Sequence, residues 1–386
     1  MLKLAFALCL ITLAVNLQAP LYTAYADLSG HGAAATAVAF SAYVLGVLPV
    51  LLALGGLADR VGRRPLICAA LVLSMVATSL TLLVPSLQTL AFARLLLGLG
   101  TGLATATATA YMGELMGEGS VARAANWVTA STSLGFGLGA ALTSLFLLPG
   151  PSLTPGSLPL HLLLAIAALL LVWRLPDPRP KQRSPMLRLP CYPRGSLPYG
   201  LAILLAWACT GLVIALLPGI LRQHGMSEWS GFSTFCVTSC GLLFQPLARR
   251  MHRVKAVLLG LAILPCSYGL LAWGADQGQL ALVLLGAVAA SSACYGFIYL
   301  GGLAAVNELA GSEKTRGSAG FFLLAYLGFS LPVIVTGVLS DRLGTQMALL
   351  LFGGVLLLGC VAVALGLMVA GRASSRMNPL LQESSL

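Results

Sequence analysis

Long apolar runs separated by short polar breaks follow one another along nearly the whole chain of 386 residues. A helix advances about 1.5 Å per residue and the hydrocarbon layer is about 30 Å thick, so about 20 apolar residues are enough to cross it. Hydrophobic residues make up 58% of the sequence and charged residues 9%, too few charges for the surface of a soluble domain. The alternation typical of a membrane β-barrel is absent. The sequence therefore predicts an all-α polytopic membrane protein.

Twelve spans are predicted from hydropathy and from the glycines and prolines between the runs. The first could instead be a signal peptide cleaved near "NLQA". Its apolar stretch continues to Tyr25, beyond the length of a signal core, so we predict a span. The predicted spans cover residues 3–25, 36–57, 65–84, 88–111, 122–148, 158–174, 198–220, 228–247, 254–274, 279–305, 315–340 and 345–370.

The positive charges are distributed unevenly along these spans. The chain has 22 Lys and Arg against 11 Asp and Glu, and 19 of the 22 fall on one side of the predicted membrane, all but Arg94, Arg222 and Arg342. Because Lys and Arg are retained on the cytoplasmic side, this bias predicts an inner (plasma) membrane protein with both termini in the cytoplasm. The net charge of +11 is then explained by membrane topology. Contacts with anionic membrane lipids are expected, and a nucleic-acid partner is not.

A segment rich in prolines and basic residues, "LPDPRPKQRSPMLRLPCYPRGSL", divides the spans into two sets of six. It is predicted to be a cytoplasmic linker. "YMGELMGEGSVARAANW" after the fourth span matches "AVNELAGSEKTRGSAGF" after the tenth, which indicates a repeated six-helix unit, as in secondary transporters. The predicted organisation is an N-terminal six-helix bundle at 1–174, the linker at 175–197, a C-terminal six-helix bundle at 198–370 and a cytoplasmic tail at 371–386.

Four charged residues gather in the loop after the second span, "GGLADRVGRR". This loop fills every specified position of the pattern G-x-x-x-D-R-x-G-R-R, and "RLLLGLGTG" in the fourth span places Arg94 before spaced glycines. With these motifs, the chain resembles the major facilitator superfamily over all twelve spans. The resemblance implies the major facilitator fold, two six-helix bundles related by pseudo-two-fold symmetry, and secondary transport by alternating access.

The resemblance also implies a role for the charged loop as a latch between the halves. Asp59 would meet the positive N-terminal end of the eleventh span near Arg316, and the loop arginines would pair with Glu114. Such a latch on the cytoplasmic face favours the outward-open state. In the alternative the arginines only orient the loop, which leaves Asp59 and Gly62 without a reason. The residues assigned to the latch are Gly55, Asp59, Arg60, Gly62, Arg63, Arg64, Glu114, Arg123, Glu308 and Arg316.

Polar residues inside spans are costly in lipid, so they are expected to face a cavity or another helix. A single Ser or Thr can instead bond its own helix carbonyl, and Tyr or Trp can be core or interfacial residues. Mid-span amides have more hydrogen-bonding positions than one carbonyl satisfies. Amides and rings with scarcely any acid indicate a cavity for an amphiphilic or aromatic organic molecule. The residues predicted to line it are Asn16, Gln18, Tyr22, Thr101, Asn126, Trp207, Tyr295 and Tyr299.

Asp27 and Arg94 are predicted to form a proton-coupling pair. Asp27 is the only acid close enough along the outer half of the membrane to offset a buried arginine in the fourth span. In the alternative, Asp27 is a solvated loop residue and Arg94 binds backbone carbonyls. His161 in the sixth span is the next candidate for coupling.

The favoured function is a proton-coupled exporter of drug-like compounds or of a secreted metabolite such as a siderophore. A proton-linked importer of a small metabolite and a membrane-embedded sensor are the alternatives. Ala140 stands where antiporters of the family commonly have proline, which weakens the case for export. Motifs such as H-E-x-x-H and G-x-S-x-G are absent, so no enzyme is expected. The expected partners are a small organic substrate, protons and lipids; a monomer without cofactor or metal is predicted.

Overall fold

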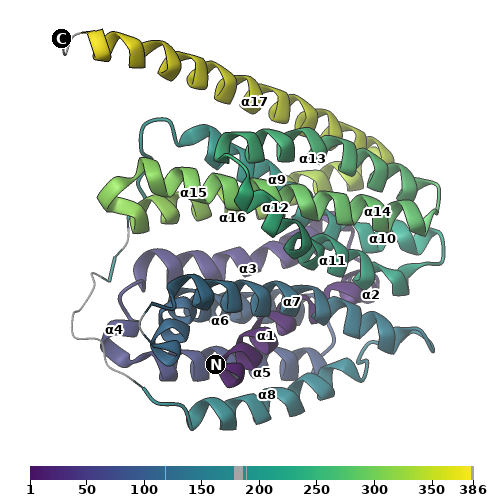
Figure 1. Cartoon of the computed structure of the whole chain (residues 1–386). Coiled ribbons are helices and arrows are strands. Elements are labelled where there is room, and N and C mark those ends of the chain that lie inside the picture. Colours follow the sequence, from purple (N-terminus) through teal and green to yellow (C-terminus); the bar gives the residue numbers. More distant parts are fainter. Residues whose placement is uncertain (118, 178–185, 188, 384–386) are drawn as a thin grey trace.

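The computed structural model describes residues 1–117, 119–177, 186–187 and 189–383, and every regular element in them is helical. This confirms the all-α prediction. In Figure 1 the helices of the first half, in purple and blue, form one group, and those of the second half, in green and yellow, form another beside it. The first half comprises α1 (Leu2–Leu17), η1 (Ala19–Leu21), α2 (Tyr22–Leu28), α3 (Ala33–Ala53), α4 (Ala58–Val61), α5 (Arg63–Leu83), α6 (Leu87–Met116), α7 (Val121–Leu147) and α8 (Ser157–Trp173).

The second half follows the linker and repeats the pattern of long helices, with more interruptions. It comprises α9 (Leu197–Ala215), α10 (Leu217–Gln223), η2 (Ser227–Trp229), α11 (Ser230–Ser239), η3 (Cys240–Phe244), α12 (Gln245–Arg250), α13 (Arg253–Asp276), α14 (Leu280–Ser291), η4 (Ser292–Ile298), α15 (Tyr299–Leu309), η5 (Gly311–Glu313), α16 (Lys314–Leu343) and α17 (Thr345–Glu383).

Eleven segments of the described residues are helical, long and apolar enough to cross a membrane. The remaining predicted span, the sixth at 158–174, corresponds to α8, which has 17 residues and is shorter than the others. The predicted end of the second span was wrong. This span ends at Ala53, because residues 54–57 form the turn before α4. The last predicted span, 345–370, agrees with the apolar part of α17, Thr345–Val369, and the helix itself continues to Glu383.

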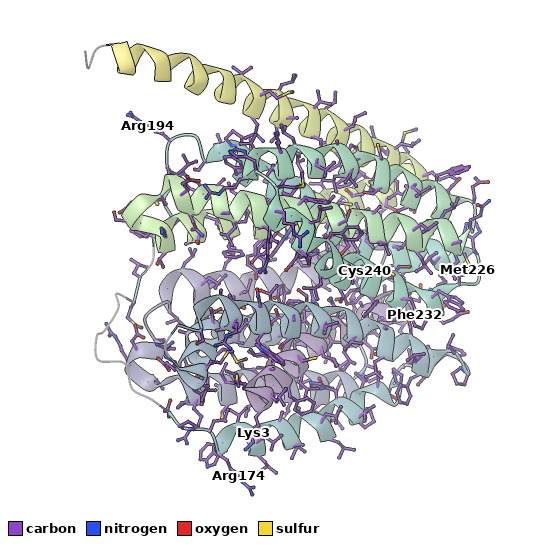
Figure 2. All side chains as sticks on the ribbon, viewed as in Figure 1. Lys3, Arg174, Arg194, Met226, Phe232 and Cys240 are labelled. Atoms are coloured by element: carbon purple, nitrogen blue, oxygen red, sulfur yellow. The ribbon has the colours of Figure 1, made fainter. Side chains whose placement is uncertain are left out.

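The helix ends define two faces of the molecule. The linker face carries the start of α1, the α4 turn and the described ends of the linker, and the opposite face carries the turns at Gly30, Gly150, Gly225 and Gly344. The linker face is on the left in Figure 1. In Figure 2, Arg194 lies toward this side, whereas Met226 and Phe232 lie at the opposite face.

The halves meet through two helix pairs, α3 with α16 and α7 with α11. Small residues allow these backbones to approach closely. A Cβ on Gly337 would lie 2.9 Å from the carbonyl oxygen of Ala33, and a Cβ on Gly231 would lie 2.1 Å from that of Ala140. Packing through small residues is a usual way for helices to associate in lipid. Because these contacts lie toward the opposite face, they bring the halves together there.

Several spans change helix type partway across. The first changes at η1, which contains Pro20, and the seventh changes between α9 and α10, where Pro218 lies. Proline lacks the N–H that would continue the helical ladder, so both residues favour a break. The tenth span passes through a π-helical stretch, Ser292–Ile298. A π-helical turn holds an extra residue and redirects its side chains, as often happens at functional sites.

Gly98 allows α6 to pack directly on the backbone of α3. A Cβ at this position would lie 2.1 Å from the carbonyl oxygen of Tyr43, a backbone atom that cannot rotate away. We expect Gly98→Ala to lower the free energy of unfolding by about 1 to 3 kcal/mol, measured by denaturant unfolding of the purified protein in detergent. Gly354→Ala is the matched control, since nothing lies within 4 Å of its Cβ. Equal stability of the two variants would contradict the packing.

Candidate functional site

A cavity of about 500 Å³ lies between the two halves. Residues of α1, α3, α6 and α7 line one side, and residues from α9 to α16 line the other. The lining includes Thr109, Arg249 and Leu303, which lie near the linker-face ends of α6, α12 and α15. The cavity therefore extends from the middle of the helices toward the linker face.

Aromatic rings dominate the deep part of this cavity. The indole of Trp207 lies at the centre of a cluster, edge-to-face with Tyr326 at a centroid distance of 5.0 Å and with Phe329 at 5.9 Å. Tyr295, from the π-helical stretch, lies 6.3 Å from the same indole. Such a wall favours a ligand with an apolar, planar part. The aromatic lining consists of Tyr43, Phe136, Trp207, Tyr295, Tyr299, Phe322, Tyr326 and Phe329.

Some of the neutral polar groups of the lining bond nearby carbonyls. Thr101 Oγ1 donates to Leu97 O at 2.8 Å, and Thr238 Oγ1 donates to Thr234 O at 2.7 Å, one turn back in each helix. Asn16 differs, because its Nδ2 donates to Phe136 O of α7 at 2.9 Å, which ties α1 to α7 beside the cavity. Asn16 Oδ1 and Trp207 Nε1 are buried without a hydrogen-bond partner among the described residues. One acceptor and one donor of the lining are therefore available to a ligand.

Among the described residues that line the cavity, Arg249 is the only charged one. It lies in the last turn of α12, and its Nη1 donates to Asn126 Oδ1 of α7 at 2.7 Å. The contact joins the second half to the first at the linker-face end of the cavity. Both side chains are exposed, so the guanidinium is accessible from this face.

Polar contacts close the opposite face above the cavity. The carboxylate of Asp341 in α16 accepts hydrogen bonds from the backbone N–H groups of Ala33 at 2.8 Å and Ala34 at 2.9 Å, at the start of α3. Asp27 of α2 pairs with Arg222 of α10. Each contact joins one half to the other. The cavity is thus bounded toward the opposite face and reaches the linker face.

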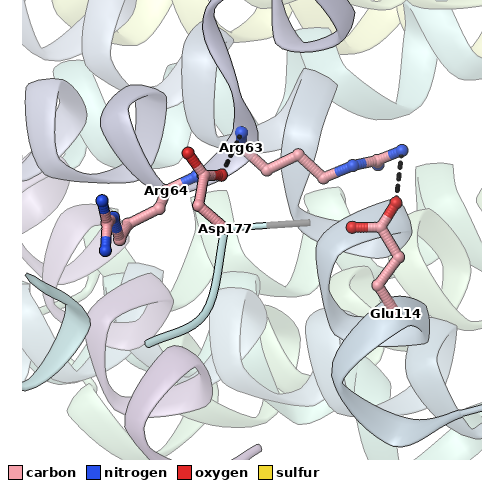
Figure 3. A network of polar contacts seen from close by, with 4 residues as sticks. All are labelled: Arg63, Arg64, Glu114 and Asp177. Carbon is pink, nitrogen blue, oxygen red and sulfur yellow. Dashed lines mark hydrogen bonds and ion pairs between the residues drawn. The ribbon is translucent and has the colours of Figure 1, made fainter. Parts of the chain in front are cut away.

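The charged loop lies on the linker face and is drawn in Figure 3. Arg63 Nη2 lies 2.7 Å from Glu114 Oε1 at the end of α6, the pairing that the resemblance implied. Asp177, at the start of the linker, accepts hydrogen bonds from the backbone N–H groups of Arg63 at 3.0 Å and Arg64 at 3.1 Å. Gly62 has φ +105°, and a Cβ there would lie 2.5 Å from an Asp177 oxygen. Glycine is therefore required at this position for two reasons.

The other predicted latch residues lie around the same face. Arg64 Nη1 donates to the carbonyls of Trp173 and Leu175 at 3.2 Å each. Arg316 binds Leu189 O at 3.1 Å and pairs with Glu313, and Glu308 pairs with Arg253. Asp59 and Arg60 lie on α4, with Gly55 just before it, and Arg123 lies near the start of α7. The role of these residues as a latch stays a prediction.

The family model of the Major Facilitator Superfamily matches residues 4–331. The chain belongs to this superfamily. Its members are secondary transporters, so the prediction of a transporter and not an enzyme is confirmed. The match covers both halves and includes the charged loop.

Relatives of this major facilitator chain include a curated protein and solved structures. The chain is 29% identical over 367 residues to the 3-(3-hydroxy-phenyl)propionate transporter of Escherichia coli (strain K12), covering 86% of this chain and 82% of the relative. The nucleoside transporter NupG has a similar fold, with a TM-score of 0.74, 14% identity and coverage of 95% and 98%. A D-xylose-proton symporter gives a TM-score of 0.69, 16% identity and coverage of 94% and 96%. The structures support the fold.

Arg94 of this major facilitator protein does not contact Asp27, so the predicted pair was wrong for this conformation. The guanidinium is fully buried, with Nη1 donating to Val15 O at 2.7 Å and Nε and Nη2 donating to Phe40 O at 3.3 and 3.2 Å. It also lies 4.8 Å from the ring centroids of both Phe40 and Tyr43. Carbonyl dipoles and ring faces stabilise this cation, while Asp27 pairs with Arg222 at the opposite face.

Five of the eight predicted cavity residues line the cavity, namely Asn16, Thr101, Trp207, Tyr295 and Tyr299. The other three were misplaced. Gln18 faces α5, where its Nε2 donates to Thr81 Oγ1 at 2.8 Å, and Tyr22 packs edge-to-face on Phe40. Asn126 lies beside the lining as the partner of Arg249. His161 is also away from the cavity, fully buried with Nδ1 3.0 Å from Thr78 Oγ1.

Sequence reasoning missed Arg249 and several rings of the cavity. Arg249 belongs to a basic cluster that indicates topology, and nothing in that pattern shows which arginine faces inward. Tyr43, Phe322 and Phe329 lie in apolar runs and resemble core residues. A helical-face projection of the second and eleventh spans could have suggested Tyr43 and Phe329. In both spans, small residues lie one or two helical turns from these rings.

Proposed function

We propose that this protein carries a small aromatic monocarboxylate across the inner membrane by alternating access, using the cavity between its halves. One observation carries the proposal: the described lining of the cavity is aromatic and has a single charged residue, Arg249. A guanidinium binds a carboxylate through two parallel hydrogen bonds, and the rings above it suit an aryl group. The residues that line the cavity include no Asp or Glu, which disfavours a cationic substrate.

The size of the cavity and the curated relative support the same substrate class. A volume of about 500 Å³ lies in the range of sites for small organic ligands. The relative at 29% identity is named for transport of a phenylpropionate, a ring that carries a carboxylate on a short chain. The same volume range also includes drug-sized ligands, so the choice of an aromatic monocarboxylate depends on the single arginine and the aromatic wall.

We propose that the linker face is cytoplasmic, with both termini on that side. The excess of Lys and Arg in the loops of this face supports the orientation. The present conformation is then inward-open, because the cavity reaches the linker face while Asp341, Asp27 and their partners close the opposite face. We expect a monomer surrounded by membrane lipids, since two six-helix halves already enclose the cavity.

Proton coupling and direction remain part of the proposal. Export is the prediction of the sequence and import its alternative, and Ala140 in place of proline in the fifth span argues against export. Asp27 stays the candidate proton site, now with Arg222 as its partner. Protonation of the acid would remove this ion pair between the halves.

Flux in reconstituted proteoliposomes tests the proposed function. The panel is 3-phenylpropionate and benzoate, the matching primary alcohol and amide, an aromatic amine and a sugar, with imposed pH gradients of both signs. We expect carboxylate flux that the gradient accelerates in one direction, with little flux of the amine or the sugar. Preferred flux of the amine would overturn the substrate class. Binding of a carboxylate without any flux would support the sensor alternative and overturn transport.

A further inference from the structure

Two antiparallel helices from different halves, α3 and α16, lie side by side along the interface. α3 has 21 residues and α16 has 30, so each extends over at least about 30 Å. An aspartate lies beyond or near the C-terminal end of each helix: Asp59 is in α4, six residues after the end of α3, and Asp341 is the third residue from the end of α16. Because the helices are antiparallel, each aspartate lies at the membrane face where the partner helix begins.

At the opposite face Asp341 supplies a cap that α3 lacks in its own sequence. The N-cap residue of α3 is Gly32, which has no side chain to accept hydrogen bonds from the first turn. Asp341 accepts them instead, from Ala33 and Ala34, and its negative charge lies at the positive end of the helix. The cap belongs to the other half, so it forms only while the halves are together at this face.

The surrounding residues fit this contact closely. A Cβ on Gly32 would lie 2.5 Å from Asp341 Oδ1, so glycine leaves the space that the carboxylate occupies. One turn earlier in α16, Gly337 packs on Ala33 and Ala37, and further along Ser41 Oγ reaches Ser330 O at 3.5 Å. The ion pair of Asp27 with Arg222 is on the same face but about half-exposed, and exposed pairs contribute little.

The start of α16, at the linker face, also lacks a cap from its own N-cap residue. The side chain of this residue, Glu313, pairs with the Arg316 side chain and makes no capping hydrogen bond to the backbone N–H groups of the first turn. The superfamily pattern assigns Asp59 to this helix end in the outward-open state. Formation of both caps at once would close the cavity from both faces, so an open cavity is compatible with only one of them.

We propose that Asp341 is the opposite-face latch of the transport cycle and that it alternates with Asp59. In the conformation described here, Asp341 holds the start of α3 and keeps the opposite face closed. Rocking of the halves releases this cap and brings Asp59 to the start of α16. One pair of helices then carries both gates, and the two aspartates bias the equilibrium in opposite directions.

Hydrogen–deuterium exchange of the purified protein in lipid nanodiscs tests this. We expect Asp341→Ala to increase exchange at 32–44 and 330–343 and to decrease exchange at 245–256 and 303–316, as the population shifts outward by about five- to tenfold. Asp59→Asn should shift the same peptides in the reverse sense. Asp276→Ala is the matched control, because this opposite-face acid bonds Gln346 and Gln277 within its own half.

Three outcomes would overturn the proposal. Exchange of Asp341→Ala identical to that of Asp276→Ala would show that the cap has no influence on the gate. Faster exchange confined to the first turn of α3, with the linker face unchanged, would make Asp341 a local helix cap only. A shift of Asp59→Asn in the same direction would remove the alternation. If the alanine variant does not fold, Asp341→Asn and Gly32→Ala, which places a Cβ against the carboxylate, replace it.

Discussion

Arg249→Gln is expected to weaken binding of an aromatic carboxylate by about 10- to 100-fold, because hydrogen bonds to a charged group contribute about 1.5 to 3 kcal/mol. Glutamine retains much of the length of the side chain and one donor group, but it loses the positive charge. The aromatic wall is unchanged, so binding of the matching neutral alcohol should stay the same. Isothermal titration of the purified protein with both ligands measures the difference.

Arg250→Gln is the control for this prediction. Arg250 is the next residue of α12, has the same charge and is exposed, yet it does not line the cavity. A loss of the positive potential of the linker face would affect both variants equally. Equal weakening in the two variants, or weakening of the neutral alcohol by Arg249→Gln, would refute the assigned carboxylate contact. Flux in proteoliposomes should follow the same order as binding.

Arg94→Met is expected to lower the free energy of unfolding by about 1 to 3 kcal/mol. The wild-type guanidinium joins three helices through Val15 O and Phe40 O and lies against two ring faces, all without access to solvent. Methionine fills part of the volume but leaves these carbonyls without their donor. Denaturant unfolding in detergent measures the loss, and Arg222→Met at the half-exposed Asp27 pair should cost less than about 1 kcal/mol.

Arg94→Lys distinguishes a structural role from proton coupling. An ammonium group cannot reach carbonyls of two helices with the geometry of a guanidinium, so the lysine variant should also be destabilised. If it were as stable as the wild type and had instead lost the effect of the pH gradient on flux, Arg94 would be a coupling residue. The structure favours the first result, because carbonyl groups surround the arginine and its predicted acid binds elsewhere.

The parts of the fold that depend on local sequence could be predicted, and those that depend on distant contacts could not. The lengths of the apolar runs and the pattern of the charged loop are local properties, so the spans and this loop could be predicted directly. Gln18 and Asn16 show the limit: both are amides of the first span, yet one bonds Thr81 behind α1 and the other borders the cavity. Residues two apart on a helix point about 200° away from each other, so only one of the two amides can face the cavity, and which one does depends on how α1 packs against α5 and α7.

Charge was similarly ambiguous when only the sequence was considered. Arg249 and Arg250 are adjacent and equivalent as topology signals, but the last turn of α12 presents only the first to the cavity. The role of Asp177 could not be predicted for the same reason. Its position in the linker gives no sign that it accepts two hydrogen bonds from backbone N–H groups at the start of α5. Such roles depend on which elements become neighbours after folding.

The capping by Asp177 also fixes one end of the connection between the halves. At the other end, the Cys191 N–H donates to Arg316 O at 3.1 Å and Arg316 Nε donates to Leu189 O at 3.1 Å, so the chain is attached to α16. The chain between these two attachments runs from Asp177 to Leu189, and an extended chain of that length spans at most about 40 Å. Loss of either attachment would lengthen this connection and with it the largest separation that the two halves can reach.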